Sequence, residues 1–259
     1  MSHPHLQVNA NGEPFLALET NPDIIITPPR LSDIPTLPDL LNDPGVYIWL
    51  SLFPQQTTID TDGHLCDAQD RFSIETQTVA SVDHSVSWVP PLVEESKRLL
   101  QQLEEDPLGL FGGCPLRYIR KVNQDGSDVL IGDIGIQRCT TMELVAGPKV
   151  DQDAAKALQT LNNERKVGDP EILWSVGYFL VPAYAGRGIM SSAFKAVLEK
   201  WAIPRMGVRR MLASAYRDNI GSQNVLKKNG FVFREIFEKH IEARNQLHDV
   251  CVFDWRLEE

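Results

Sequence analysis

The chain has 259 residues, of which 42% are hydrophobic and 23% charged, and its formal net charge at pH 7 is −10. This composition is typical of a globular domain and excludes a fibrous or wholly disordered protein. The acidic balance argues against a general binder of polyanions, because a nucleic acid needs a basic face. We therefore expect no nucleic-acid partner.

The cysteines and the apolar runs bear on the compartment. Cys66, Cys114, Cys139 and Cys251 form no CxxC pair and have no histidine at metal-ligand spacing, so we expect reduced thiols and no metal. The N-terminus lacks the basic start and apolar run of a secretory signal. The longest apolar run, "VYIWL", is far shorter than the roughly 20 residues of a membrane helix. A cytoplasmic protein without a membrane partner is expected.

The first half of the chain divides into a leader, one domain and an insertion. Residues 1–22 are polar and predict a flexible leader, so the domain is expected over 23–259. "DIIITPPRL" predicts a short strand, and a helix capped by Ser32 or Asp33 follows it. A polar stretch at about 54–90 is interpreted as an insertion. "PPLVEESKRLLQQLEED" then has the acidic first turn and the apolar stripe of a helix.

The middle of the chain predicts a sheet. "LRYIRKV" and "DVLIGDIGIQRC" flank an Asp-Gly turn, which favours an antiparallel pair. A second insertion is expected at about 140–170, with one or two helical turns between 154 and 161. "EILWSVGYFLV" is nearly all apolar, as in a central strand buried on both faces. A helix from Ile189 up to Pro204 and the strand "GVRRMLASAY" complete a βαβ unit, whose strands should be parallel.

The C-terminal part predicts one more helix and two strands. "DNIGSQNVLKKNGF" has Asn219 as a natural N-cap and Gly230 in place for a left-handed helix end. "FREIFEKHIEA" and "HDVCVFDWRLE" read as strands. The chain is therefore predicted to be an α+β protein built on one mixed sheet.

The turn before the helix of this βαβ unit has the residues of an anion site. A helix start leaves about four N–H groups without internal partners and carries partial positive charge. Gly186 and Gly188 would let an anion approach the backbone, and Arg187 could add a charged contact. A small-residue turn needed only for packing is the alternative. Ser191 stands where a dinucleotide-binding turn has its third glycine, and the Gly-Lys-Ser/Thr of a Walker loop is missing.

This segment resembles the acyl-CoA-binding motif of the GCN5-related N-acetyltransferases (GNAT), in the RimJ/RimL-like branch of ribosomal-protein N-terminal acetyltransferases. The motif is Gln/Arg-x-x-Gly-x-Gly/Ala at a helix start. Gly186 and Gly188 match its small positions, and Ala183 replaces its Gln or Arg. Three further segments are similar to this branch: "TPPRLSDIPTLPDLLNDPGVYIWL", "DNIGSQNVLKKNGF" and "LHDVCVFDWRLEE". The residues that match within them are Arg30, Leu31, Asp33, Asn219, Ser222, Lys228, Gly230, Phe231 and Asp249.

The resemblance implies a single mixed, mostly antiparallel sheet flanked by helices, with acetyl-CoA as co-substrate. The pantetheine arm would enter between two parallel central strands that splay apart, bound by backbone groups of Phe179 and Val181. The pyrophosphate would lie on the turn from Gly186 to Met190. The cofactor-binding residues implied are Phe179, Leu180, Val181, Gly186, Arg187, Gly188, Ile189, Met190, Asn219 and Ser222.

The implied reaction is transfer of the acetyl group to a primary amine, either a protein N-terminus or a small amine. Ser222 is the first candidate to stabilise the leaving thiolate, and Tyr216 is the second. The alternative for Ser222 is that it only satisfies the helix start. Tyr178 is interpreted as sheet packing, with a role facing the cleft as the alternative.

Two catalytic residues usual in the family have no match. Ser175 stands where many members carry a glutamate base, and Leu226 stands at the position of the usual tyrosine acid. Glu171 is the first substitute considered for the base, with Asp133 and Glu143 behind it. A non-catalytic acyl-CoA sensor or interaction module of the same fold therefore stays open as an alternative.

Overall fold

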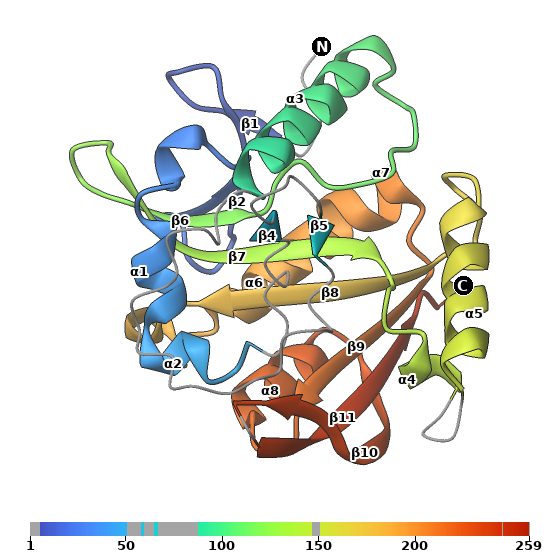
Figure 1. Cartoon of the computed structure of the whole chain (residues 1–259). Helices are drawn as coiled ribbons and strands as arrows, with labels where there is room; N and C mark the ends of the chain where they lie inside the picture. The colour runs from blue at the N-terminus through green and yellow to red at the C-terminus, as the bar shows by residue number, and fades with distance from the viewer. Residues whose placement is uncertain are drawn as a thin grey trace.

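The computed structural model describes residues 6–50, 88–146, 151–244 and 246–258, and also 58–59 and 65–66. Figure 1 shows the arrangement of its helices and strands. The strands are β1 (Gln7–Val8), β2 (Pro14–Ala17), β3 (Ile24–Thr27), β4 (Thr58–Ile59), β5 (Leu65–Cys66), β6 (Tyr118–Val122), β7 (Asp128–Arg138), β8 (Leu173–Leu180), β9 (Arg210–Tyr216), β10 (Val232–Ala243) and β11 (Gln246–Arg256). The helices are α1 (Leu37–Asn42), α2 (Pro44–Tyr47), α3 (Val89–Glu105), α4 (Glu143–Ala146), α5 (Gln152–Glu164), α6 (Ile189–Val197), α7 (Ile203–Met206) and α8 (Ile220–Lys228).

One mixed sheet of nine strands forms the centre of the molecule, in the order β1-β2-β3-β6-β7-β8-β9-β11-β10. The β8–β9 pair is parallel, and the other neighbouring pairs are antiparallel. β7 and β8 pair along most of their length, whereas β8 and β9 pair only from Leu173↔Arg210 to Ser175↔Leu212. The predicted α+β fold with a splayed parallel pair is confirmed.

The two faces of the sheet carry different helices. On one face α6 packs Phe194 against strand residues such as Trp174 and Met211, and it lies behind the sheet in Figure 1. The other face buries Leu212, Tyr216 and Val250 beneath the segment before and within α4. It also buries Tyr118 and Leu130 beneath α1 and the start of α3. Alternate strand residues therefore belong to different cores, as the pleat of a strand requires.

The prediction of a flexible leader is wrong for residues 6–22. β2 pairs with β3 as an outer strand of the sheet, and the Leu16 side chain is fully buried. The apolar run "FLAL" within this polar segment is enough for one short strand, β2, which lies between β1 and β3. Residues 1–5 lie outside the described part of the chain.

The two expected insertions have different outcomes. The one at about 54–90 lies mostly outside the described residues, apart from the pair β4–β5 and the start of α3. In the one at about 140–170 the structure describes α4 and α5, and α5 is longer than the two turns expected. Its start is fixed by Asp151, whose carboxylate accepts a hydrogen bond from the Ala154 N–H at 2.7 Å.

Two details of the βαβ unit differ from the sequence-based prediction. β8 is not buried on both faces, since Trp174 is fully buried but Gly177 is exposed. On the side toward β9, its C-terminal half borders a cavity, whereas its other side stays paired with β7. The helical segment also continues past Pro204, through a π-helical turn at Leu198–Ala202 and into α7, which ends at Met206. The wider turn lies next to Pro204, which has no N–H for the helix ladder.

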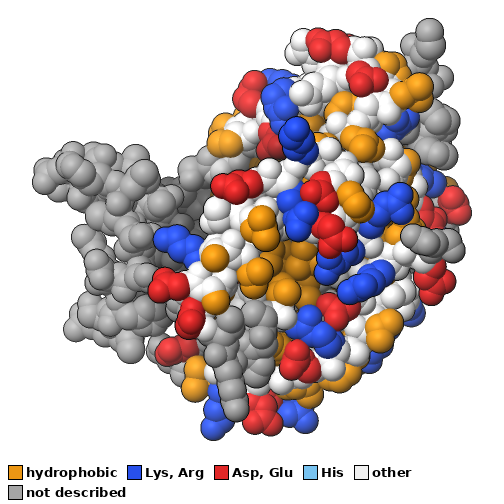
Figure 2. Space-filling model, turned by 90° about the vertical axis from the view of Figure 1, so that its right-hand side faces the viewer, with side chains coloured by type: hydrophobic (Ala, Val, Ile, Leu, Met, Phe, Trp, Pro, Cys, Tyr) orange, Lys and Arg blue, Asp and Glu red, His pale blue; other side chains and the backbone are white. Residues whose placement is uncertain are grey.

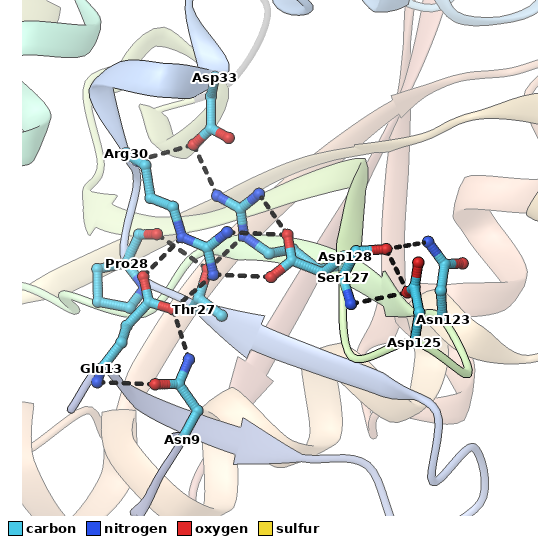
Figure 3. A network of polar contacts seen from close by, with 11 residues as sticks. Asn9, Glu13, Thr27, Pro28, Arg30, Asp33, Asn123, Asp125, Ser127 and Asp128 are labelled. Carbon is cyan, nitrogen blue, oxygen red and sulfur yellow. Dashed lines mark hydrogen bonds and ion pairs between the residues drawn. The ribbon is translucent and has the colours of Figure 1, made fainter. Parts of the chain in front are cut away.

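A network of charged side chains joins β2, β3, β6 and β7 near one edge of the sheet (Figure 3). Arg30 donates to Glu13 and, through both terminal nitrogens, to Asp128 at 2.8 and 2.9 Å. The buried Arg120 donates to Asp33 at 2.7 Å and to Asp128 at 3.3 Å. Arg30 and Asp33, which belong to the segment "TPPRLSDIPTLPDLLNDPGVYIWL", therefore form ion pairs that link strands of the sheet.

On the face seen in Figure 2, Lys and Arg side chains are interspersed with Asp and Glu side chains. Cys114, Cys139 and Cys251 are free thiols. Among the described helices, none has the length and apolar character needed to cross a bilayer. The described residues also contain no group of three side chains placed to bind a metal ion.

Candidate active site

A cavity of about 690 Å³ opens where β8 and β9 separate. The two strands stop pairing after Ser175 and Leu212, and their remaining residues line the opening. The start of α6, one side of α8 and the residues after α2 also contribute to its wall. The backbone edge of β8 beyond Ser175 is therefore open to a bound molecule rather than to a neighbouring strand.

The predicted glycine turn lies at one end of this cavity. Gly186 and Gly188 have φ angles of 74° and 76°, which only glycine adopts without strain, and Gly188 is the N-cap of α6. A Cβ atom at either glycine would meet no heavy atom within 4 Å. Ile189 and Met190 anchor the helix start in the core with 3% and 6% exposure. The first turn of α6 thus offers accessible N–H groups to an anion.

Arg187 lies beside this turn but does not line the cavity. It is exposed, and its guanidinium lies 5.7 Å from the ring centroid of Tyr184, which does line the cavity. The side chain is long enough to reach a negative group at the rim.

The backbone edge of β8 differs in one detail from the predicted arm site. The Val181 N–H donates to the Ile131 carbonyl at 2.8 Å, so it belongs to the sheet and is not free for a ligand. The Phe179 carbonyl also faces β7, since a Cβ atom on Gly132 would lie 2.5 Å from it. Because successive residues of a strand point their polar groups to opposite sides, Tyr178 and Leu180 present theirs toward the gap. The prediction that backbone groups of Phe179 and Val181 bind the arm is therefore wrong by one residue, since the groups that face the gap belong to Tyr178 and Leu180.

The polar centre of the cavity combines β8 with the start of α8. The Asn219 side chain accepts from the Ser222 N–H at 3.0 Å and so caps the helix, as predicted. The Tyr178 and Ser222 hydroxyl oxygens lie 2.9 Å apart, and the Tyr178 hydroxyl also donates to the Ser222 carbonyl at 3.2 Å. All three residues line the cavity. Tyr178 is therefore part of the site and not only sheet packing.

The electrostatics of this pair favour a protonated tyrosine. Burial raises the pKa of Tyr178 to about 12, and the hydrogen bond to Ser222 offsets only part of that shift. Its hydroxyl thus stays a hydrogen-bond donor throughout the neutral range.

The sequence alone did not show that Tyr178 belongs to the site. Alternation along β8 predicts that Tyr178 and Gly177 face opposite sides of the sheet. It does not predict where β8 and β9 separate, and so it does not show which of the two residues borders the cavity.

Tyr216 lies on the opposite face of the sheet from α6 and α8. Its side chain is 6% exposed, and its ring stacks on His248 with 4.5 Å between centroids. It lines the cavity, but its hydroxyl makes no hydrogen bond to Ser222 or to any other described residue.

The carboxylates considered as bases do not come to the site. Glu171 forms an ion pair with Arg210 at 2.5 Å. Arg210 lies in the part of β9 that still pairs with β8, away from the point where the two strands separate. Asp133 accepts two hydrogen bonds from Arg117, and Glu143 begins α4. Of the described residues that line the cavity, Lys228 is the only charged one. The structure therefore separates Glu171 from Ser222 and Tyr216.

A protein-family model described as "Acetyltransferase (GNAT) domain" matches residues 23–232. Among curated proteins, the chain is 34% identical over 74 residues to "Probable N-acetyltransferase YjcK" of Bacillus subtilis, which is 29% of this chain and 40% of that protein. It is 32% identical over 79 residues to "Uncharacterized N-acetyltransferase YnaD" of the same organism, covering 30% of this chain and 46% of that protein. The chain thus aligns with less than half the length of these curated relatives.

Solved structures share the fold at low identity. Mycobacterium smegmatis RimJ in complex with CoA-disulfide superposes with a TM-score of 0.54 at 13% identity, covering 94% of this chain and 86% of that one. Microcin C7 self immunity acetyltransferase MccE, in complex with acetyl-CoA and AMP, gives 0.53 at 12% identity, with 93% and 96% covered. RimL, the ribosomal L7/L12 alpha-N-protein acetyltransferase, gives 0.52 at 13% identity, with 97% and 99% covered.

Proposed function

Because the chain belongs to the acetyltransferase (GNAT) family, whose domain model matches residues 23–232, we propose that it transfers the acetyl group of acetyl-CoA to a primary amine. The observation that carries this proposal is the cavity between β8 and β9, which has an accessible glycine turn at one end and a hydroxyl pair at its centre. The complexes of RimJ with CoA-disulfide and of MccE with acetyl-CoA support the choice of co-substrate.

The cavity fits the parts of acetyl-CoA in order. The pyrophosphate would bind to the N–H groups of the first turn of α6, from Gly188 onward, with Arg187 at the rim. The pantetheine amides would pair with the free backbone edge at Tyr178 and Leu180, as an added strand does. The thioester would then lie near Ser222, between the separated strands.

The proposed reaction is a direct attack of the acceptor amine on the thioester of acetyl-CoA. The lone pair of the neutral amine forms a bond to the thioester carbonyl carbon, and the carbon–sulfur bond breaks. The nitrogen loses a proton and the leaving thiolate gains one, which yields an N-acetyl product and free CoA. Ser222, supported by Tyr178, would donate a hydrogen bond to the developing thiolate. With no carboxylate in the described lining, water would take the proton from the amine.

The acceptor is proposed to be a protein N-terminus or a small amine. RimL is named for the acetylation of an α-amine of ribosomal L7/L12, which supports the first of these. The absence of a carboxylate among the described lining residues favours acceptors that carry no further positive charge near the reacting amine.

The proposal is tested by acetyl-CoA binding and by thiol release in the presence of amines. Gly186→Glu puts a negative charge into the phosphate site, so the affinity for acetyl-CoA should fall roughly 100-fold in calorimetry. Gly186→Ala carries the same positive-φ strain without charge and should bind more tightly than Gly186→Glu. Gly126→Glu places the same residue at a hairpin glycine with φ 84° and equally open surroundings, so it should bind like the wild type.

Two results would contradict the proposal in different ways. Unchanged acetyl-CoA affinity in Gly186→Glu would place the pyrophosphate elsewhere. Binding of acetyl-CoA without thiol release, from any amine of a panel of peptides and small amines, would favour a non-catalytic acyl-CoA sensor.

A further inference from the structure

The Tyr216 hydroxyl is a buried polar group without a hydrogen-bond partner among the described residues. Three other buried side-chain atoms share this state, on Trp88, Tyr118 and Trp174. Of the four residues, only Tyr216 lines the cavity between β8 and β9. Buried hydroxyl groups in proteins are usually paired, so an unpaired one on a residue that lines a binding cavity points to a ligand.

The position of Tyr216 in β9 puts it on the side from which an acceptor would come. Strand residues four apart share a face, so Tyr216 lies with Leu212, and the register places Leu212 beside Ser175 of β8. This face is opposite to α6, where Tyr178 packs against Phe194. If the proposed function holds, acetyl-CoA enters from the α6 side. The amine must then reach the thioester from the Tyr216 side.

The tyrosine ring is held in place before any acceptor binds. It stacks on His248 at 4.5 Å with 20° between the ring planes, and its neighbours include Val250 and Phe237. Since the side chain is 6% exposed, its hydroxyl has little freedom to turn toward bulk water. A fixed donor of this kind contributes to binding without a large loss of side-chain entropy.

Among the described residues, the lining on this face is neutral. Besides Tyr216, its polar members are hydroxyl and amide side chains, namely Gln137, Thr140, Thr141, Ser175 and Ser214. Groups of this kind match carbonyl and hydroxyl oxygens and do not neutralise an additional ammonium group. We propose that the Tyr216 hydroxyl donates a hydrogen bond to a neutral oxygen of the acceptor next to its reacting amine, and so selects amines that carry such an oxygen.

The test compares two small amines, alaninamide and isopropylamine, which differ in a carboxamide beside the amine. Thiol release gives kcat/KM for each amine with the full-length wild type and with Tyr216→Phe. The two amines differ in basicity, so their kcat/KM values are not compared directly. For each amine, kcat/KM of Tyr216→Phe is divided by kcat/KM of the wild type, and the two ratios are compared. We expect kcat/KM of Tyr216→Phe to be roughly tenfold lower with alaninamide and unchanged with isopropylamine.

Two further readouts separate substrate recognition from a structural role. The hydroxyl makes no hydrogen bond within the described residues, so its removal should leave the melting temperature equal or higher, and acetyl-CoA affinity should stay the same. Tyr118→Phe is the matched control, since Tyr118 also has a buried unpaired hydroxyl but lies outside the cavity lining. It should acetylate both amines like the wild type.

The results that would contradict the role of Tyr216 differ from those that would contradict acetyl transfer. An equal fall in kcat/KM for both amines, no fall for either, or a lower melting temperature of Tyr216→Phe would overturn the inference and leave the acetyltransferase proposal standing. Failure of the wild type to acetylate alaninamide, isopropylamine or an alanine tripeptide amide, despite binding acetyl-CoA, would refute the transfer proposal itself.

Discussion

Ser222 carries two polar groups near the site, and the structure gives them different partners. Its N–H is the group that Asn219 caps, whereas its hydroxyl lies 2.9 Å from the hydroxyl of Tyr178. The sequence left open whether Ser222 only satisfies the start of α8. Since the cap uses the amide and not the side chain, the hydroxyl, together with that of Tyr178, is left for a role in the cavity.

Removal of this hydroxyl is expected to affect turnover more than binding. In Ser222→Ala we predict a roughly tenfold lower kcat for thiol release, because a donor to the leaving thiolate is lost. The Kd of acetyl-CoA from calorimetry should change by less than about twofold. Ser222→Thr keeps a hydroxyl at the same atom and should recover much of the rate. An unaltered kcat in Ser222→Ala would remove Ser222 from the mechanism.

At the level of whole elements, the tip of the β10–β11 hairpin holds the end of α2. The Arg244 guanidinium donates to the carbonyl oxygens of Tyr47, Ile48 and Leu50 at 3.0, 2.7 and 3.2 Å. It also lies 5.1 Å from the centroid of the Tyr47 ring. Carbonyls at a helix C-terminus lack internal partners, and a cation satisfies them well. Leu50 and the neighbouring Trp49 line the cavity, so this contact fixes part of its wall.

Loss of the contact should loosen the acceptor side of the cavity. For Arg244→Ala we predict a several-fold higher KM for the amine, with the KM for acetyl-CoA nearly unchanged, measured by thiol release at varied concentrations of each. Arg209→Ala removes an exposed arginine just before β9 and is the control. A rise in both KM values alike would show instead that the hairpin supports the cofactor side.

The order of the elements could be predicted because it depends on local patterns. The N-cap Asn219 and the left-handed Gly230, whose φ is 83°, follow from steric and hydrogen-bonding rules that act within a few residues. Tyr178 and Glu171 were misread for a different reason. Tyr178 depends on where two strands separate, and Glu171 on an arginine 39 residues away, and neither is visible in a local pattern.

At the scale of the whole molecule, stability and chemistry depend on separate groups of charges. The network of Figure 3 joins β2, β3, β6 and β7, and none of its residues lines the cavity between β8 and β9. Asp128 is central to it, since it pairs with both Arg30 and Arg120. Burial alone would raise the pKa of Asp128, but the hydrogen bond from Arg30 and the charges of the two arginines outweigh it and hold the pKa below 3.8.

This depressed pKa sets the direction of a pH effect. A carboxylate whose pKa is lower in the folded than in the unfolded state stabilises the fold above the unfolded value of 3.8. That contribution is lost as the pH falls through the folded pKa. Asp128→Asn should therefore lower the free energy of unfolding at pH 7 by roughly 2–3 kcal/mol, because two arginines lose a charged partner. The gap between variant and wild type should narrow below pH 3.8.

Urea unfolding from pH 7 to pH 3 measures this gap, and Asp39→Asn at an exposed site of α1 is the control that should match the wild type throughout. Acetyl-CoA affinity of folded Asp128→Asn should equal that of the wild type, because the network lies outside the cavity lining. A stability gap that stays constant down to pH 3 would mean that the substitution acts through packing rather than charge. A loss of acetyl-CoA affinity would mean that the outer strands transmit strain to β8 through β7, which pairs with it along most of its length.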